Sequence, residues 1–306
     1  MVSPIAFIAA NLGGAFLLGL VRDQWRTSCY VLTLVVLAFT SALAAGWVWT
    51  LSSGSATAIE VLTAGTEPPF AINLRFGLAE AVLVLLINLA ALLSVIYLKD
   101  TMLKQGRRAM AVLLVFAMAL SGIVMTRDLF NLFVFFELTV ISTGGLVLLS
   151  RDERALGAGF KYLVASQVIA ILMLIGTIFA YHATGSLNLD FMAASSEVLL
   201  SGGALAFFLI FIAVVTELKV FPANGWALDI YESAHPAFSA LVSAAAGSAT
   251  LFAIDKLLLI GGAPWMAVAT AVGIVSFVGA NLFALAQGSD RRLLGYSSVA
   301  QIGLLL

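Results

Sequence analysis

The feature that most constrains this chain is the recurrence of apolar runs of about 20 residues, the length that crosses the hydrocarbon core of a bilayer. Hydrophobic residues make up 62% of the 306 positions and charged residues only 10%. A soluble globular domain carries roughly 25% charged residues, and a water-soluble fold of this length could not hide so much apolar surface. The sequence therefore predicts an all-α, polytopic bundle of transmembrane helices.

Polar residues, glycines and prolines divide the chain into about ten expected spans. The spans lie near residues 4–21, 28–50, 77–98, 109–126, 128–149, 159–181, 203–232, 236–260 and 265–287, and a tenth begins near 293. The first run lacks a cleavage site of the A-x-A type after a basic segment, so we expect it to be retained. We expect one domain over residues 1–306.

Two segments are expected to lie at the membrane surface instead of crossing it. Residues 51–74 predict a β-hairpin, because Gly65 and the pair Pro68 and Pro69 separate short apolar runs. Residues 183–200 predict a loop followed by an amphipathic helix in the membrane interface.

Lysine and arginine collect in every second expected loop, and cytoplasmic loops are the ones enriched in these residues. The odd-numbered loops hold Arg22, Arg26, Lys99, Lys104, Arg107, Arg108, Arg151, Arg154, Arg291 and Arg292. The even-numbered loops are nearly free of base, with Arg127 alone between the fourth and fifth spans. The pattern predicts a multi-pass protein of the cell inner (plasma) membrane with its N-terminus outside.

Composition also excludes several classes of function. The net charge of −1 and the lack of a basic run argue against a nucleic-acid partner. A single cysteine, Cys29, rules out a thiolate-bound cluster within the chain, and His182 and His235 are too far apart in sequence to form a metal motif. The sequence has no haem pair and no glycine-rich nucleotide loop, so we expect no cofactor, no metal and no catalytic centre. Any electron transfer would then occur in partner subunits.

Several ionisable residues fall inside the expected spans, where each costs on the order of 2.5–3.5 kcal/mol on insertion scales. Glu137 lies about midway along the fifth span, and Lys219 lies deep in the seventh with Glu217 two residues before it. Two interpretations remain open for Glu137 and Lys219. They form either a static structural ion pair or a carboxylate whose proton affinity is set by a movable lysine, a role that suits lysine because burial can deprotonate it.

The other charged residues near span ends have simpler interpretations. Lys161, close to the start of the sixth span, either reaches the cytoplasmic surface or bridges Glu137 and Lys219. Asp255 and Lys256 are expected at the interface. Glu80 is expected to be a surface carboxylate.

The seventh span contains the segment VFPANGW, in which Pro222 is followed by Asn224 and Gly225. Proline removes an intrahelical hydrogen bond and clashes with the preceding turn. Broken helices at membrane depth survive only where protein buries them or where they line a watery cavity. We therefore expect a discontinuous seventh helix that serves an ion pathway, with a simple packing kink as the alternative.

Four segments in order resemble the antiporter-like subunits shared by respiratory complex I, membrane-bound hydrogenases and Mrp-type Na+/H+ antiporters. They are DLFNLFVFFEL, ALGAGFKYLVASQ with GTIFAYHATGSLNL, FPANGWALDIYESAHP and DRRLLGYSSVAQIG, and the resemblance runs from about residue 70 to 306. It implies that Glu137 takes the family's functional glutamate position and that Lys161 and Tyr162 match its lysine-tyrosine pair. Pro222 and Trp226 match the family's broken seventh helix.

Two positions depart from the family pattern. The family's seventh-span lysine falls here on Glu217, and Lys219 stands two residues later. The family's eighth-span lysine or histidine falls on Ser248, with Thr250 and Asp255 as candidates to replace it. Family members also continue past the tenth span, so we expect the 306 residues to be the N-terminal two-thirds of a longer protein or a split gene product.

The resemblance implies a proton-translocating, antiporter-like membrane subunit of a redox-driven ion-pumping complex, with other membrane subunits as its partners. The proton pathway is expected to use Glu137, Lys219, Lys161, Glu217 and Ser248. The alternatives are a subunit of an Mrp-type Na+/H+ antiporter, driven by an ion gradient, and a scaffold subunit that no longer pumps. The sequence leaves the choice between protons and sodium ions open.

Overall fold

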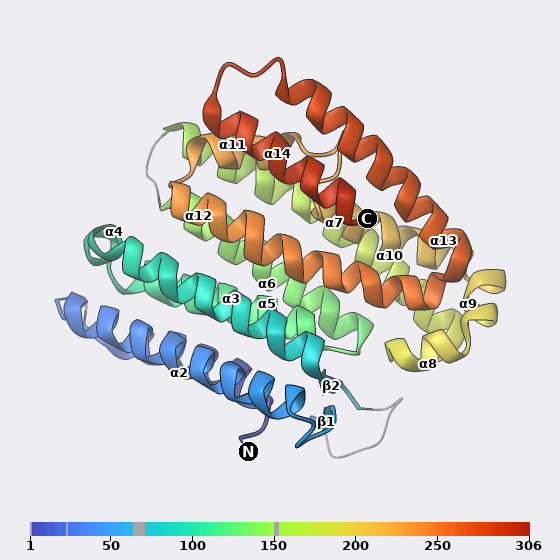
Figure 1. Ribbon diagram of the computed structural model, residues 1–306, viewed down its shortest axis with the longest axis horizontal. Helices are drawn as coiled ribbons and strands as arrows, with labels where there is room; N and C mark the ends of the chain where they lie inside the picture. The colour runs from blue at the N-terminus through green and yellow to red at the C-terminus, as the bar shows by residue number, and fades with distance from the viewer. Residues whose placement is uncertain (1, 23, 64–70, 150–152) are drawn as a thin grey trace.

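The computed structural model describes residues 2–22, 24–63, 71–149 and 153–306, and almost all of its regular structure is helical (Figure 1). The long helices of the first half run side by side in the bundle. They are α1 (Ile5–Leu20), α2 (Arg26–Ser52), α3 (Leu78–Tyr97), α5 (Arg107–Met125), α6 (Leu129–Leu148) and α7 (Glu153–Thr184), and the short α4 (Lys99–Gln105) joins α3 to α5. The expected all-α membrane-type architecture is confirmed, and each of these long helices falls close to an expected span.

The second half of the chain is more interrupted. It contains α10 (Ala204–Glu217), α11 (Gly225–Ser233), α12 (Pro236–Leu241), the π-helix η1 (Val242–Ala246), α13 (Gly247–Ala284) and α14 (Asp290–Leu305). Gly262 has φ 64°, a left-handed conformation that glycine adopts without steric cost, and Pro264 follows it. The chain turns back at this point (Figure 1), so the expected spans 236–260 and 265–287 form a helical hairpin.

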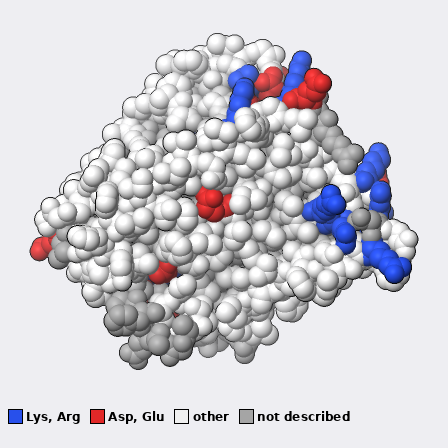
Figure 2. Space-filling view, turned by 180° about the vertical axis from the view of Figure 1, so that it is seen from behind, with Lys and Arg blue, Asp and Glu red and all other residues white. Residues whose placement is uncertain are grey.

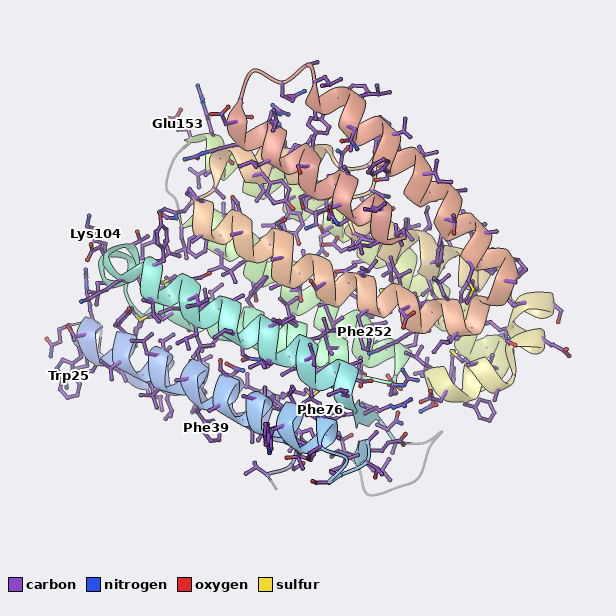
Figure 3. All side chains as sticks on the ribbon, in the orientation of Figure 1. Trp25, Phe39, Phe76, Lys104, Glu153 and Phe252 are labelled. Atoms are coloured by element: carbon purple, nitrogen blue, oxygen red, sulfur yellow. The ribbon has the colours of Figure 1, made fainter. Side chains whose placement is uncertain are left out.

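Six helical segments in the described residues are long and apolar enough to cross a bilayer. They are α2, α3, α5, α6, α7 and the stretch Pro236–Ala284, which turns back at Gly262. The apolar helices α1 and α10 are shorter. Large apolar side chains such as Trp49 and Leu285 are exposed on the outside of the bundle. Figure 3 shows that Trp25, just before α2, and Phe39 of α2 also lie on the outside. An apolar outer surface is what a bundle surrounded by lipid requires.

The segments expected at the membrane surface have their own short structures. Strands β1 (Ile59–Leu62) and β2 (Asn73–Phe76) pair antiparallel, which confirms the strands of the expected hairpin. Gly65, Pro68 and Pro69 of its connection lie outside the described residues. Over 183–200 the chain forms α8 (Leu189–Ala194) and the start of α9 (Ser196–Gly202) instead of one interfacial helix.

Charge is distributed unevenly over the bundle. Figure 2 shows a largely uncharged face on which lysine and arginine side chains gather along one side. Figure 3 places Lys104 and Glu153 at the same end of the bundle as Trp25. The basic loops after α1, α3 and α6 thus meet at one end, as their alternation in sequence predicts; Arg151 lies outside the described residues. We call this the basic end.

Candidate functional site at the interrupted helix

The seventh span is broken, as its sequence predicts. Helix α10 ends at Glu217 and α11 begins at Gly225, and residues 218–224 between them form turns. The break starts at Leu218, four residues before Pro222, and the next residue, Lys219, has φ 68°. Residues other than glycine rarely adopt this left-handed conformation, and those that do are often found at functional sites. Lys219 therefore lies just beyond the end of α10, in the break itself.

The Lys219 side chain is buried, with 2% of its surface exposed. Its ammonium group donates hydrogen bonds to the Tyr231 hydroxyl at 3.1 Å and to the Val242 carbonyl at 2.9 Å. Val242 is the first residue of the π-helix, a distortion of the helical ladder that is frequent at functional sites. The lysine is thus held by α11 and η1, and these partners differ from the Glu137 carboxylate that the sequence suggested.

Glu217, the last residue of α10, is held by α7. The Tyr162 hydroxyl donates to one carboxylate oxygen at 3.1 Å and the Ser166 hydroxyl to the other at 3.3 Å. Tyr162 and Ser166 are four residues apart, so they lie on the same face of the helix. Ser166 was not among the residues predicted from the sequence, although its spacing from Tyr162 places it on the same helix face.

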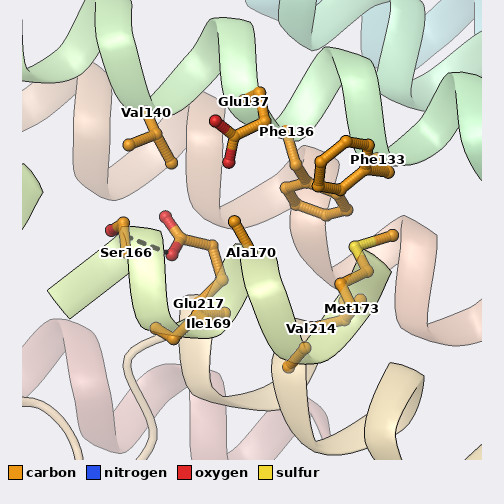
Figure 4. Close-up of a pocket in the computed structure, with 11 residues that line it drawn as sticks. Phe133, Phe136, Glu137, Val140, Ser166, Ile169, Ala170, Met173, Val214 and Glu217 are labelled. Carbon is orange, nitrogen blue, oxygen red and sulfur yellow. Dashed lines mark hydrogen bonds between the residues drawn. The ribbon is translucent and has the colours of Figure 1, made fainter. Parts of the chain in front are cut away.

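Glu137 on α6 faces Glu217 across a small cavity. The cavity has an empty volume of about 290 Å³, and both glutamates and Ser166 line it together with apolar side chains. Figure 4 shows the two carboxylates directed toward the space between their helices. Gln167 of α7 donates a hydrogen bond to Glu137 at 3.2 Å, so one helix positions both acidic groups. Gln167 is a further residue that sequence reasoning missed.

A second cavity lies between Glu217 and Lys219. Its empty volume is about 290 Å³. Hydroxyl groups surround it: Thr139, Thr143, Tyr162 and Thr250 all contribute to its wall. Glu217 therefore borders both cavities and stands between Glu137 on one side and Lys219 on the other.

Comparison with known proteins identifies the family of this chain. Residues 126–306, more than half of the chain, match the family described as NADH:quinone oxidoreductase/Mrp antiporter, TM. This chain belongs to that antiporter-like family. The match begins at the end of α5 and takes in every residue of the two cavities.

Individual proteins that are similar to this chain support the same family assignment. NADH-quinone oxidoreductase subunit N of Myxococcus xanthus is 30% identical over 297 residues, which are 91% of this chain and 57% of the relative. A chain of the membrane-bound sulfane sulfur reductase, an archaeal respiratory membrane complex, superposes with TM-score 0.90 at 26% identity. The superposition covers 99% of this chain and 64% of the reductase chain. A chain of the Mrp complex from Dietzia sp. DQ12-45-1b has TM-score 0.87 at 23% identity, over 97% of this chain and 57% of its own, and shows the same fold. The chain spans about half the length of the curated relatives it matches.

Lys161 does not bridge Glu137 and Lys219. Its ammonium group lies 3.1 Å from a carboxylate oxygen of Asp229 on α11, and its side chain is 69% exposed. The long side chain carries the charge to the surface of the bundle, as the snorkelling interpretation expected. The neighbouring Tyr162, which the resemblance to the antiporter-like family also named, lines the cavity of Glu217 and Lys219.

Ser248, which aligns with the eighth-span position of the antiporter-like family, lies outside both cavities. Its side chain is exposed and donates to the Ala244 carbonyl of its own helix at 2.6 Å. It shares a separate hollow with Asp255. Thr250, two residues later, is the residue of α13 that reaches the cavity of Glu217 and Lys219.

The expectation that Glu80 is a surface carboxylate is wrong, and Lys256, which was expected at the membrane interface, is buried within the bundle. Lys256 is buried, with 2% exposed, and donates to the carbonyls of Ile123, Val124 and Thr126 at 2.9, 2.6 and 2.9 Å. These carbonyls belong to the C-terminal end of α5, where backbone acceptors lack helical partners. Glu80 is also buried and accepts a hydrogen bond from the Gly77 amide at 3.0 Å, which caps the start of α3. Both charges satisfy helix ends instead of facing solvent.

Proposed function

We propose that this chain is the proton-translocating, antiporter-like membrane subunit of a redox-driven ion-pumping complex. It is a multi-pass membrane protein of a family whose members include NADH-quinone oxidoreductase subunit N. The observation that supports translocation is the row of ionisable groups Glu137, Glu217 and Lys219, joined by two small cavities at a broken helix. Ionisable groups inside membrane spans are expensive and mark ion pathways.

The row can move protons because its members influence each other's charge. Glu137 and Glu217 line one cavity, so a proton held by one carboxylate can pass to the other. Lys219 lies on the other side of Glu217, at the second cavity. A displacement of Lys219 between its present partners, Tyr231 and Val242, and the cavity beside Glu217 would then bind or release a proton at Glu217. The hydroxyls of Tyr162 and Ser166 hold the Glu217 carboxylate in place for both steps.

The proposal includes a topology and a set of partners. The chain crosses the cell inner (plasma) membrane about ten times, with the N-terminus outside and the basic end in the cytoplasm. Other membrane subunits accompany it, and the redox chemistry occurs in those partners. The similarity to a subunit of a respiratory membrane complex supports this assignment.

The test is ion translocation by the assembled complex in membrane vesicles. With the electron donor present, we expect acidification or alkalinisation that Glu217→Gln abolishes while the amount of assembled complex stays unchanged. Gln keeps the size and most hydrogen bonds of Glu but cannot hold the charge. Normal translocation in the Glu217→Gln complex would contradict the proposal.

The second candidate function is that of an Mrp-type antiporter subunit, because Mrp antiporters belong to the same family. An Mrp-type subunit would exchange Na+ for protons in vesicles without any electron donor. A scaffold subunit would show neither activity, and its loss would affect only assembly.

A further inference from the structure

We propose that two layers of side chains form a gate between the basic end of the bundle and the cavity of Glu217 and Lys219. The outer layer is the ion-pair cluster of Lys161, Asp229 and Arg292, and the inner layer is the stacked pair of Tyr162 and Trp226. The gate is closed in this structure. Only the identity of the ion that passes the gate rests on the proposed function; the gate itself does not.

The outer layer joins three helices at one carboxylate. Asp229 of α11 accepts from Lys161 of α7 at 3.1 Å and from Arg292 of α14 at 3.2 Å, one bond to each oxygen. Arg292 also pairs with Glu232 at 3.0 Å. Because both oxygens of Asp229 are engaged, Asp229 links α7 and α14 to α11 by ion pairs only while its carboxylate is charged.

Water reaches this layer from the basic end. A hollow with an empty volume of about 600 Å³ is lined by Arg154, Gly157, Lys161 and Asp229, among others. The Asp229 side chain keeps 25% of its surface exposed at the bottom of the hollow. Ions in the aqueous phase therefore meet the ion pairs first.

The inner layer lies directly behind the outer one. Tyr162 follows Lys161 on α7, and Trp226 lies one helical turn before Asp229 on α11. The two rings have centroids 4.7 Å apart with an interplanar angle of 32°. Both rings also line the cavity of Glu217 and Lys219. Between the hollow and the cavity, the path thus leads past this aromatic pair.

The Trp226 ring can leave its position without breaking a hydrogen bond of its own. Its Nε1 is buried and has no hydrogen-bond partner among the residues that the structure describes. A buried, unpaired N–H is unfavourable, so water that enters between the rings would stabilise the open state. Release of Lys161 and Arg292 by Asp229 frees α11, which carries Trp226, to move away from Tyr162.

The experiment measures access to the cavity in the full protein, in membrane vesicles. Thr250→Cys places a reporter thiol in the cavity wall, at a residue whose hydroxyl bonds the Ala246 carbonyl of its own helix. The probe is 2-(trimethylammonium)ethyl methanethiosulfonate, whose permanent charge keeps it from crossing the membrane; it is added on the side of the basic end, and the rate of thiol modification is recorded. Protein with Cys29 but without the introduced thiol gives the background.

Asp229→Asn is expected to raise the modification rate about tenfold, because two partly exposed ion pairs are lost together. Glu232→Gln is the matched control: it makes the same charge change on the same helix, loses only the pair with Arg292, and is expected to leave the rate within about twofold. Lys161→Met is a second opening variant that keeps the Asp229–Arg292 pair, with a smaller increase expected.

Equal rates in parent, Asp229→Asn and Lys161→Met would overturn the gate and leave the cluster as a structural joint. Less folded protein in Asp229→Asn together with an unchanged rate in Lys161→Met would overturn it as well. Thiol modification does not require pumping, so the gate can fail while the proposed function stands. Failure of the proposed function would appear instead as normal translocation in the Glu217→Gln complex.

Discussion

The hydroxyl of Tyr162 donates a 3.1 Å hydrogen bond to the carboxylate of Glu217. This bond joins α7 to the last residue of α10. Without this bond, Glu217 would be a poorly solvated carboxylate at a helix C-terminus, where negative charge is unfavourable. Tyr162 also stacks on Trp226. One side chain therefore positions the proposed proton carrier and forms part of the proposed gate.

Tyr162→Phe separates these two roles, because phenylalanine keeps the ring and removes the hydroxyl. Hydrogen bonds to charged groups contribute about 1.5–3 kcal/mol, and 1.4 kcal/mol corresponds to a factor of about ten. We expect proton translocation by the assembled complex to fall about tenfold. Tyr181→Phe on the same helix, where the ring is exposed, is the control, and equal rates in the two variants would argue against a role for the hydroxyl.

Glu137→Gln is expected to leave the assembled complex intact and to abolish most of its translocation. The side chain is partly exposed and bonds to Gln167, so a neutral amide can replace the carboxylate without stranding a buried charge. The measurement compares translocation in vesicles with the amount of assembled complex. A missing complex would indicate a structural role for Glu137.

Thr250 and Ser248 form a natural pair for comparison. Thr250→Val keeps the shape of the side chain but removes a hydroxyl from the cavity wall, so we expect slower translocation with normal assembly. Ser248→Ala removes an exposed hydroxyl from the same helix, outside the cavity, and should have no effect. The opposite order of effects would show that the family alignment at Ser248 locates the pathway better than the structure does.

Lys256→Met tests the buried cap of α5. Methionine has a similar length but leaves the carbonyls of Ile123, Val124 and Thr126 without their donor, and each buried, unsatisfied acceptor costs about 1–3 kcal/mol. We expect the detergent-solubilised protein to unfold several degrees lower in temperature. Lys104→Met, at an exposed position, should leave the unfolding temperature unchanged; equal shifts would mean that the carbonyl contacts are not what stabilises α5.

The sequence by itself determined the membrane class, most helix positions and the break in the seventh helix. These follow from local causes: bilayer-length apolar runs, alternation of basic loops, and Pro222 with Gly225 inside an apolar segment. It also placed Glu137, Glu217 and Lys219 on the two spans that the structure brings together. Local signals suffice here because each depends on residues that are close in the chain.

Only the tertiary structure decided which charged groups meet. The direction of a side chain depends on helix rotation, and at the break the left-handed conformation of Lys219 turns it toward Tyr231 and Val242. The π-helix and the turns at 218–224 change the rotation of the helices that follow, so Thr250 and not Ser248 reaches the cavity. The partners of Lys161 and Lys256 come from helices far away in sequence. A charge in a membrane protein takes whichever partner packing brings within reach, and the sequence of its own helix does not contain that information.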